Sequence, residues 1–212
     1  MNVPVVFLAA VLGAAYGEWL RRLLRVGTYR LADEAGPVPS RFWLAPVAAV
    51  LAMLLTGHLA DLDRWGLLPA YAGLLAVALP LAAIDLDVHR LPDRVTLPAV
   101  PVLAVLLALD WDADRMFRAF VGAGLAGAVF LLLALAVPGG MGLGDVKLAV
   151  VLALPLGWWG YLAVVQGLAL GFVIGGLVSV VLICARRATR RTHIPLGPAL
   201  LAGALTVLLA AE

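Results

Sequence analysis

Two aspartates stand where a carboxylate is costly unless it has a partner or takes part in chemistry. Asp85 directly follows a continuous apolar run, and Asp145 stands at the edge of another apolar segment. Asp145 ends a flexible stretch with four glycines among residues 139–144. Glycines give no packing area and weaken helices and strands, so they suit a place where the backbone bends close to something else.

Two carboxylates held close together in a partly dry site cannot both ionise easily, so one keeps a proton while the other stays charged. Such a pair can activate water and protonate a leaving amine, which is the chemistry of paired-aspartate peptide hydrolysis. Gly142 and Gly144 would let an extended peptide approach Asp145. Lys147 either biases the pair toward ionisation or faces water.

The neighbouring acids have simpler structural explanations. Asp87 lies two residues beyond Asp85 and should point to another side of a helix. Asp93 follows Pro92 and suits a helix N-cap or a first-turn acid beside Arg94. For Asp145 considered alone, an N-cap role is the competing explanation.

The elements that must position these residues are membrane helices. Of the 212 residues, 64% are hydrophobic and 13% charged, with a mean hydropathy of +1.07, far more apolar than a soluble domain. Apolar runs long enough to cross a bilayer recur along the whole chain, and they are too continuous for barrel strands. We expect an all-α, polytopic membrane bundle that forms one domain over residues 1–212. The expected spans are 3–20, 43–60, 67–84, 95–109, 118–137, 148–159, 160–183 and 196–211.

The positions of the positive charges predict an orientation. One alternating set of loops holds most of the cations: Arg21, Arg22, Arg25, Arg30, Arg41, Arg90, Arg94, Lys147, Arg186, Arg187, Arg190 and Arg191. The opposite set holds only Arg64, Arg115 and Arg118. The positive-inside rule then places both termini outside, and the loops of Asp85 and Asp145 on the cytoplasmic side. A net charge of +2 is too small to suggest nucleic acid as a partner.

Cys184 is the only cysteine, so neither an internal disulfide nor a cysteine zinc site is possible. We read Cys184 as a small apolar residue at a helix end. We expect no metal and no other cofactor.

Three motifs resemble those of known membrane aspartyl proteases. The sequence Gly-Leu-Gly-Asp at 142–145 resembles their GxGD signature. The pair Ile-Asp at 84–85, with Leu-Pro-Asp at 91–93 and Thr-Leu-Pro at 96–98, resembles the first aspartate motif of type IV prepilin peptidases. The sequence Ile-Pro-Leu-Gly-Pro-Ala at 194–199 resembles the element that opens the last helix of that family.

The resemblance covers roughly 67–211 and implies an eight-helix membrane endopeptidase. This family cleaves the short basic leader of prepilins and pseudopilins on the cytoplasmic side, typically after a glycine that precedes the apolar pilin helix. Asp85 and Asp145 match its two catalytic aspartates. The other motif residues, which would shape the substrate site, are Gly142, Gly144, Asp93, Pro92, Lys147, Pro195, Gly197 and Pro198.

The sequence departs from many members of that family in one region. Those members carry a large cytoplasmic domain with paired Cys-x-x-Cys zinc motifs after the first helix, and they also N-methylate the trimmed pilin. Here the corresponding loop, about 21–42, is short and has no cysteine, and residues 16–20 resemble the first-helix element only loosely. We therefore expect peptidase activity, with methylation either absent or done by another protein.

Two alternatives remain open from sequence. One is a signal-peptide-peptidase-like GxGD protease, whose PAL element is matched by Pro-Ala-Leu at 198–200, although its first motif has tyrosine where Ile84 precedes Asp85 here. The other is a small ion-coupled transporter, because paired intramembrane acids and glycine-broken helices occur there too. The expected place of the acids at the membrane edge, and the lack of a visible inverted repeat, speak against a transporter.

Overall fold

The computed structural model describes residues 3–31, 34, 36–136, 141–187 and 195–212. Within these residues the chain forms eight α-helices, so the predicted all-α class is confirmed. The helices are α1 (Val3–Arg25), α2 (Leu44–Asp61), α3 (Leu68–Val88), α4 (Asp93–Leu107), α5 (Ala113–Ala136), α6 (Leu143–Trp159), α7 (Tyr161–Cys184) and α8 (Gly197–Leu208). Two 3-10 turns, η1 (Trp65–Leu67) and η2 (Ala108–Asp110), precede α3 and follow α4.

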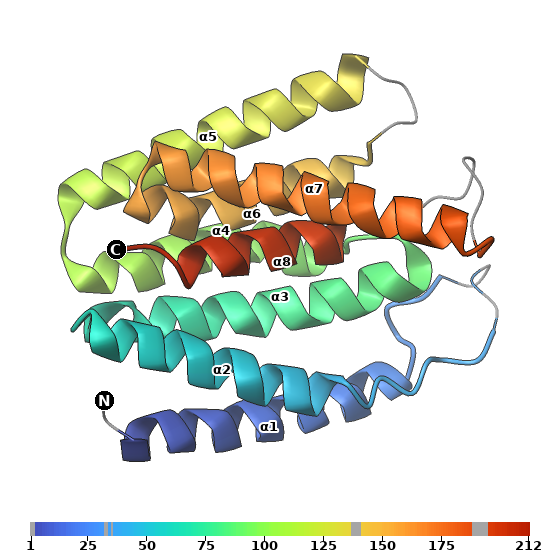
Figure 1. Ribbon diagram of the computed structural model, residues 1–212, viewed down its shortest axis with the longest axis horizontal. Helices are drawn as coiled ribbons and strands as arrows, with labels where there is room; N and C mark the ends of the chain where they lie inside the picture. The colour runs from blue at the N-terminus through green and yellow to red at the C-terminus, as the bar shows by residue number, and fades with distance from the viewer. Residues whose placement is uncertain (1–2, 32–33, 35, 137–140, 188–194) are drawn as a thin grey trace.

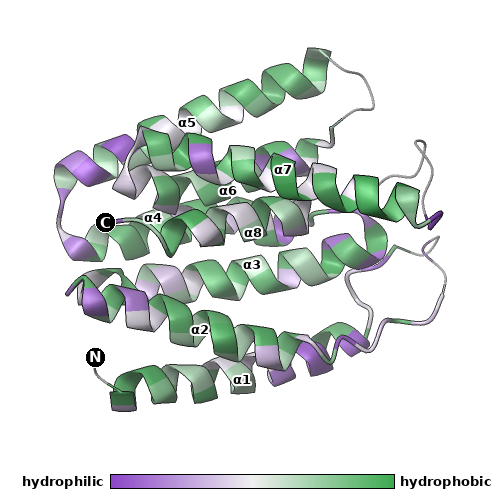
Figure 2. Ribbon diagram, viewed as in Figure 1, coloured by the Kyte–Doolittle hydropathy of each residue, from purple (hydrophilic) through white to green (hydrophobic). Residues whose placement is uncertain are grey.

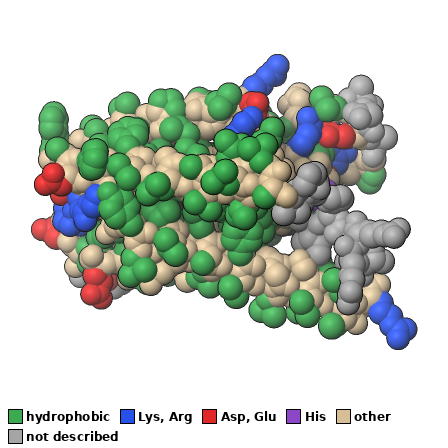
Figure 3. Space-filling view, turned by 90° about the horizontal axis from the view of Figure 1, so that it is seen from above, with side chains coloured by type: hydrophobic (Ala, Val, Ile, Leu, Met, Phe, Trp, Pro, Cys, Tyr) green, Lys and Arg blue, Asp and Glu red, His purple; other side chains and the backbone are tan. Residues whose placement is uncertain are grey.

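The helices run alternately up and down between two ends of the bundle (Figure 1). Figure 2 shows polar residues gathered at these ends and apolar residues between them, and Figure 3 shows a flank covered largely by apolar side chains. Five segments, those of α1, α2, α3 with η1, α5 and α7, are long and apolar enough to cross a bilayer. The chain is thus a multi-pass membrane protein.

Several helices extend beyond their predicted limits. α1 continues to Arg25 because Glu18 pairs with Arg21 and Arg22 at helical spacing, which stabilises a polar last turn. α3 continues to Val88, so Asp85 lies inside its last turns. α6 begins at Leu143 instead of residue 148, whereas α8 is shorter than predicted and ends at Leu208.

α6 lies in the middle of the hydrophobic core. Nearly all of its residues from Leu148 to Trp158 are buried, and the helix packs against α4, α5, α7 and α8. Pro155 lies inside this helix, and Gly160, with φ +143°, separates it from α7. The predicted sixth span is therefore a distinct helix.

Small residues let the helices approach closely. A Cβ at Gly203 of α8 would lie 2.3 Å from the backbone nitrogen of Gly171 in α7. A Cβ at Gly167 would lie 2.7 Å from the side chain of Leu156. Gly124, in contrast, has no heavy atom within 4 Å of an added Cβ, so it makes no such close contact.

Candidate active site

Asp85 is buried near the end of α3, where α8 begins. It is 5% exposed, and its Oδ2 accepts a hydrogen bond of 3.0 Å from the backbone N–H of Gly197. Gly197 is the first residue of α8, and a helix N-terminus favours a nearby negative charge. The two residues touch so closely that a Cβ at position 197 would lie 2.6 Å from Asp85 Oδ2.

Asp145 lies in the first turn of α6 and is half-buried. Its Oδ2 accepts a hydrogen bond of 3.3 Å from the backbone N–H of Gly142. Gly142 is the N-cap of α6, so the alternative that Asp145 itself is the N-cap is wrong. The carboxylate instead reaches back over the start of its own helix, where the positive end of the helix dipole stabilises it.

The structure brings the two aspartates to the same end of the bundle, where α3 ends and α6 and α8 begin (Figure 1). Asp85 lies close enough to Asp145 for its charge to act on that carboxylate. Each carboxylate also accepts one backbone N–H, from Gly197 or from Gly142. Two carboxylates that act on each other in this way can titrate as a pair.

Lys147 is partly exposed and pairs with Asp93 instead of the two aspartates Asp85 and Asp145. Its Nζ lies 2.5 Å from Oδ1 of Asp93, which ties α6 to the start of α4. Asp93 is the first residue of α4 after the N-cap Pro92, so of the two predicted positions the first-turn position is confirmed. Both side chains are substantially exposed, so this pair contributes about 1 kcal/mol or less.

The other motif residues shape the same end of the bundle. Gly144 packs on Leu91, where an added Cβ would lie 3.2 Å from the leucine Cβ. Pro195 precedes α8, and Pro198 occupies its first turn, where the missing N–H costs no helical hydrogen bond. Ile194 of the same motif lies outside the described residues.

The sequence analysis missed a polar cluster on the far side of α3. Asp87 does point away from Asp85, as predicted, but it is buried and forms ion pairs with Arg30 and Arg41. Tyr29 donates a hydrogen bond to the same carboxylate. The signal available in sequence was the pair of arginines in the longest loop, which we counted only as loop charges.

Comparison with known proteins agrees with these motifs. The sequence model of the type IV leader peptidase family matches residues 71–184. A prepilin leader peptidase/N-methyltransferase of Burkholderia pseudomallei (strain 1026b) is 33% identical over 178 residues, which are 81% of this chain and 55% of the relative. Proteins of the same description from Pseudomonas putida and Bacillus subtilis (strain 168) are 36% identical over 170 residues and 29% identical over 136 residues.

These matches cover 76% of this chain and 55% of the Pseudomonas protein, and 62% of this chain and 51% of the Bacillus protein. The chain thus spans about half the length of the curated relatives it matches. No solved structure is significantly similar to it. The family model nevertheless covers more than half of the chain and includes both aspartate motifs, and the chain belongs to the type IV leader peptidase family.

Proposed function

We propose that this protein is a membrane-embedded aspartic endopeptidase that removes the leader peptide of prepilins or pseudopilins, with Asp85 and Asp145 as its catalytic pair. The observation that carries the proposal is that the two motif aspartates lie at one end of the bundle, close enough for the charge of Asp85 to act on Asp145. The names of the relatives supply the substrate class.

The pair would act as a shared acid and base. The ionised carboxylate takes a proton from a water molecule, whose oxygen adds to the carbonyl carbon of the scissile peptide bond. The protonated carboxyl donates its proton to the carbonyl oxygen. When the tetrahedral intermediate collapses, the C–N bond breaks and the leaving amine receives a proton from the first carboxyl. The second carboxylate takes back a proton from a hydroxyl of the intermediate, so the new carboxylic acid forms and the pair returns to its starting state. Because proton donor and acceptor exchange roles, the pair and not either residue alone carries the pH dependence.

We place this end of the bundle in the cytoplasm. The described cations gather here in the loops after α1, α3 and α7, whereas the opposite end carries Arg64, Arg115 and Arg118. The start of α1 and the end of α8 lie together at that opposite end (Figure 1). The positive-inside rule then puts both termini outside.

Methyl transfer is not part of the proposal, although the relatives' names include it. The loop between α1 and α2 contains no cysteine, and the matched part of each relative is only about half of its length. As predicted, Cys184 is at the end of a helix, where it is exposed.

The direct test is cleavage by the purified protein in proteoliposomes. A prepilin with its leader should shift to the mature mobility on a gel, and mass spectrometry should locate the new N-terminus at the leader junction. A signal-peptide remnant serves as the competing substrate. Cleavage of the remnant alone, or no cleavage of any of several prepilins by folded protein, would refute the proposal.

We also expect cleavage to be independent of metal ions and thiols. Among the described residues, no group of three or more His, Cys, Asp or Glu side chains lies together as metal ligands. EDTA, 1,10-phenanthroline and N-ethylmaleimide should therefore leave the cleavage rate unchanged, because the proposed chemistry uses carboxylates alone. Inhibition by a chelator that added zinc reverses would show instead that the carboxylates hold a metal.

A further inference from the structure

We propose that the loop between α1 and α2 positions the catalytic aspartate of α3 through an ionic clamp made of Tyr29, Arg30, Arg41 and Asp87. The inference rests on the proposed function, because it assigns positioning residues to that same site. None of the four residues belongs to the motifs that identified the family, and three of them lie outside residues 71–184, the part that the family model matches.

The clamp converges on one carboxylate. Arg30 grips Asp87 with two nitrogens, Nη2 at 2.6 Å from Oδ1 and Nε at 2.9 Å from Oδ2, a bidentate arrangement. Arg41 Nη2 lies 2.9 Å from Oδ2. The hydroxyl of Tyr29 donates to the same oxygen and accepts from Arg41. Burial raises the pKa of the Tyr29 hydroxyl, which keeps the proton that it donates.

The clamp is built into the structure and is not a surface ion pair. The side chains of Asp87, Arg41 and Arg30 are only 7%, 3% and 12% exposed. A buried charge is tolerated only when it is paired and hydrogen-bonded, so removing one partner leaves the remaining charges buried without a partner, which costs stability. Arg41 also adopts φ +49°, a left-handed conformation that is unfavourable for a residue with a side chain.

Arg30 also organises the loop that carries it. Beyond Asp87, its Nη1 donates to the carbonyl of Gly36 at 2.8 Å and its Nη2 to that of Pro37 at 3.3 Å. A more exposed pair, Arg90 with Glu34 at 3.1 Å, adds a second tie between this loop and the residues just after α3. The loop is thus fastened to the end of α3 at two points.

The clamp and the partner of Asp85 hold α3 from opposite sides. Two residues along a helix turn by about 200°, so Asp87 faces away from Asp85. Asp85 meets the start of α8 at Gly197, whereas Asp87 meets the loop. Movement of this end of α3 away from the loop would therefore break the clamp, whereas movement away from α8 would break the hydrogen bond from Gly197 to Asp85. Loss of the clamp leaves Asp85 supported on one side.

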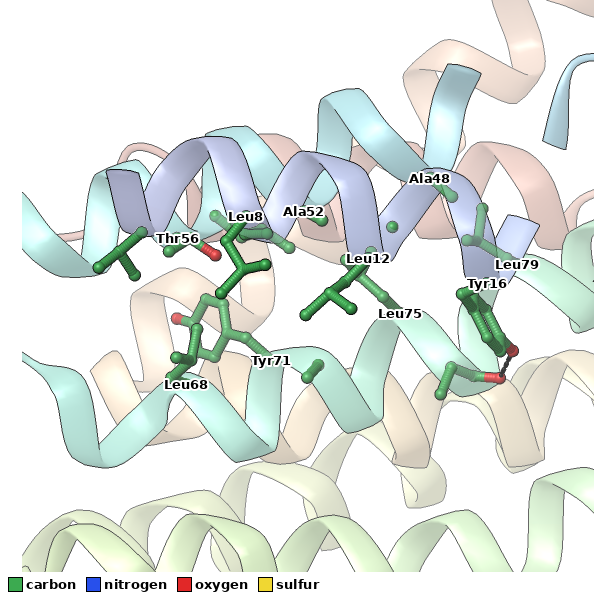
Figure 4. A pocket seen from close by; sticks show the side chains of 16 residues that line it. Leu8, Leu12, Tyr16, Ala48, Ala52, Thr56, Leu68, Tyr71, Leu75 and Leu79 are labelled. Carbon is green, nitrogen blue, oxygen red and sulfur yellow. Dashed lines mark hydrogen bonds between the residues drawn. The ribbon is translucent and has the colours of Figure 1, made fainter. Parts of the chain in front are cut away.

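α3 needs this support because its last part is weakened internally. Pro80 has no N–H, so the carbonyl of Ala76 lacks its usual helical donor. The hydroxyl of Tyr16 in α1 replaces that donor at 2.7 Å, at the edge of an apolar cavity of about 390 Å³ between α1, α2 and α3 (Figure 4). α3 ends soon afterwards at His89, which has φ +51°. Contacts from α1 and from the loop after it thus support the last part of α3, where the helix lacks one of its own hydrogen bonds.

The test compares Asp87→Asn and Arg30→Gln with Arg22→Gln. Arg22 is a matched control, since it also pairs with an acid, Glu18 at 2.8 Å, but its side chain is 73% exposed. We expect kcat for prepilin cleavage to fall about 100-fold in both clamp variants, because displacement of a reacting group by about 1 Å costs a factor of that order. KM and the kcat of Arg22→Gln should stay near the wild-type values.

Further measurements separate positioning from general loss of folding. Hydrogen exchange should rise at residues 85–89 of the clamp variants and stay unchanged in α5 and α7. The double variant Asp87→Asn/Arg30→Gln should be no slower than the worse single variant, because either change opens the same clamp. Asp87→Glu, which keeps the charge, should recover part of kcat.

If the wild-type protein cleaves normally, any one of three results would overturn the proposal. These are a wild-type kcat in the folded clamp variants, a loss that follows the fraction of unfolded protein, or independent additive effects of the two changes. A wild-type protein that fails to cleave would instead count against the proposed function, and the exchange measurement at residues 85–89 would still decide whether the clamp holds α3.

Discussion

Replacing either Asp145 or Asp85 by Asn should lower prepilin cleavage by about 10³-fold or more, because neither half of a proton-sharing pair can be supplied by an amide. Asn keeps the shape of Asp, so Asp145→Asn can still accept the N–H of Gly142 at the start of α6. Asp85→Asn can likewise accept the N–H of Gly197 through its amide oxygen. The measurement is single-turnover cleavage in proteoliposomes, read on a gel.

The control for this prediction is Asp61→Asn. Asp61 is an exposed acid at the last residue of α2, at the end of the bundle opposite the site, so its charge should not affect cleavage. All three variants should insert and purify like wild type. Cleavage near the wild-type rate in a correctly inserted Asp85→Asn or Asp145→Asn protein would remove that residue from the catalytic pair.

The fold was predictable where it depends on the length of the continuous apolar runs in the sequence. Continuous apolar runs give α2, α5 and α7 within a few residues, because a membrane helix must satisfy its backbone internally and needs a nearly fixed length. The helices that extend beyond prediction do so at ends with polar residues. An apolar run ends at the first charged residue, whereas the helix itself can continue. It continues where an ion pair such as Glu18 with Arg21 stabilises a polar turn, or where a side chain such as Asp145 accepts a free backbone N–H at the helix start.

The motif part of the site was predictable from residue type and order, since Asp85, Gly197 and Asp145 stand in recognisable sequence contexts. Their contacts were not, because bonds such as Lys147 to Asp93 depend on how helices distant in sequence pack. Asp87 was harder still. The two-residue spacing correctly predicts that Asp87 lies on a different face of the helix from Asp85. The spacing does not predict that Asp87 forms ion pairs with Arg30 and Arg41 on that face.

Gly197→Ala should lower prepilin cleavage strongly, because it adds a methyl group directly against the carboxylate of Asp85. An added Cβ would lie 2.6 Å from Asp85 Oδ2 and 3.2 Å from its Cγ, so either the carboxylate rotates or α8 moves away. Both responses break the hydrogen bond from the N–H of residue 197 and shift Asp85 relative to Asp145. We expect kcat to fall about 100-fold, the cost of misplacing a reacting group by about 1 Å.

Gly176→Ala is the matched control for that change. Gly176 lies within α7, where an added Cβ meets no heavy atom within 4 Å, and alanine favours a helix over glycine. Gly144→Ala should fall between the two, because its Cβ would lie 3.2 Å from that of Leu91, a contact that a small shift relieves. If the three variants cleave equally fast, the carboxylate of Asp85 tolerates a methyl group at position 197. The close approach of α8 then does not determine the position of that carboxylate.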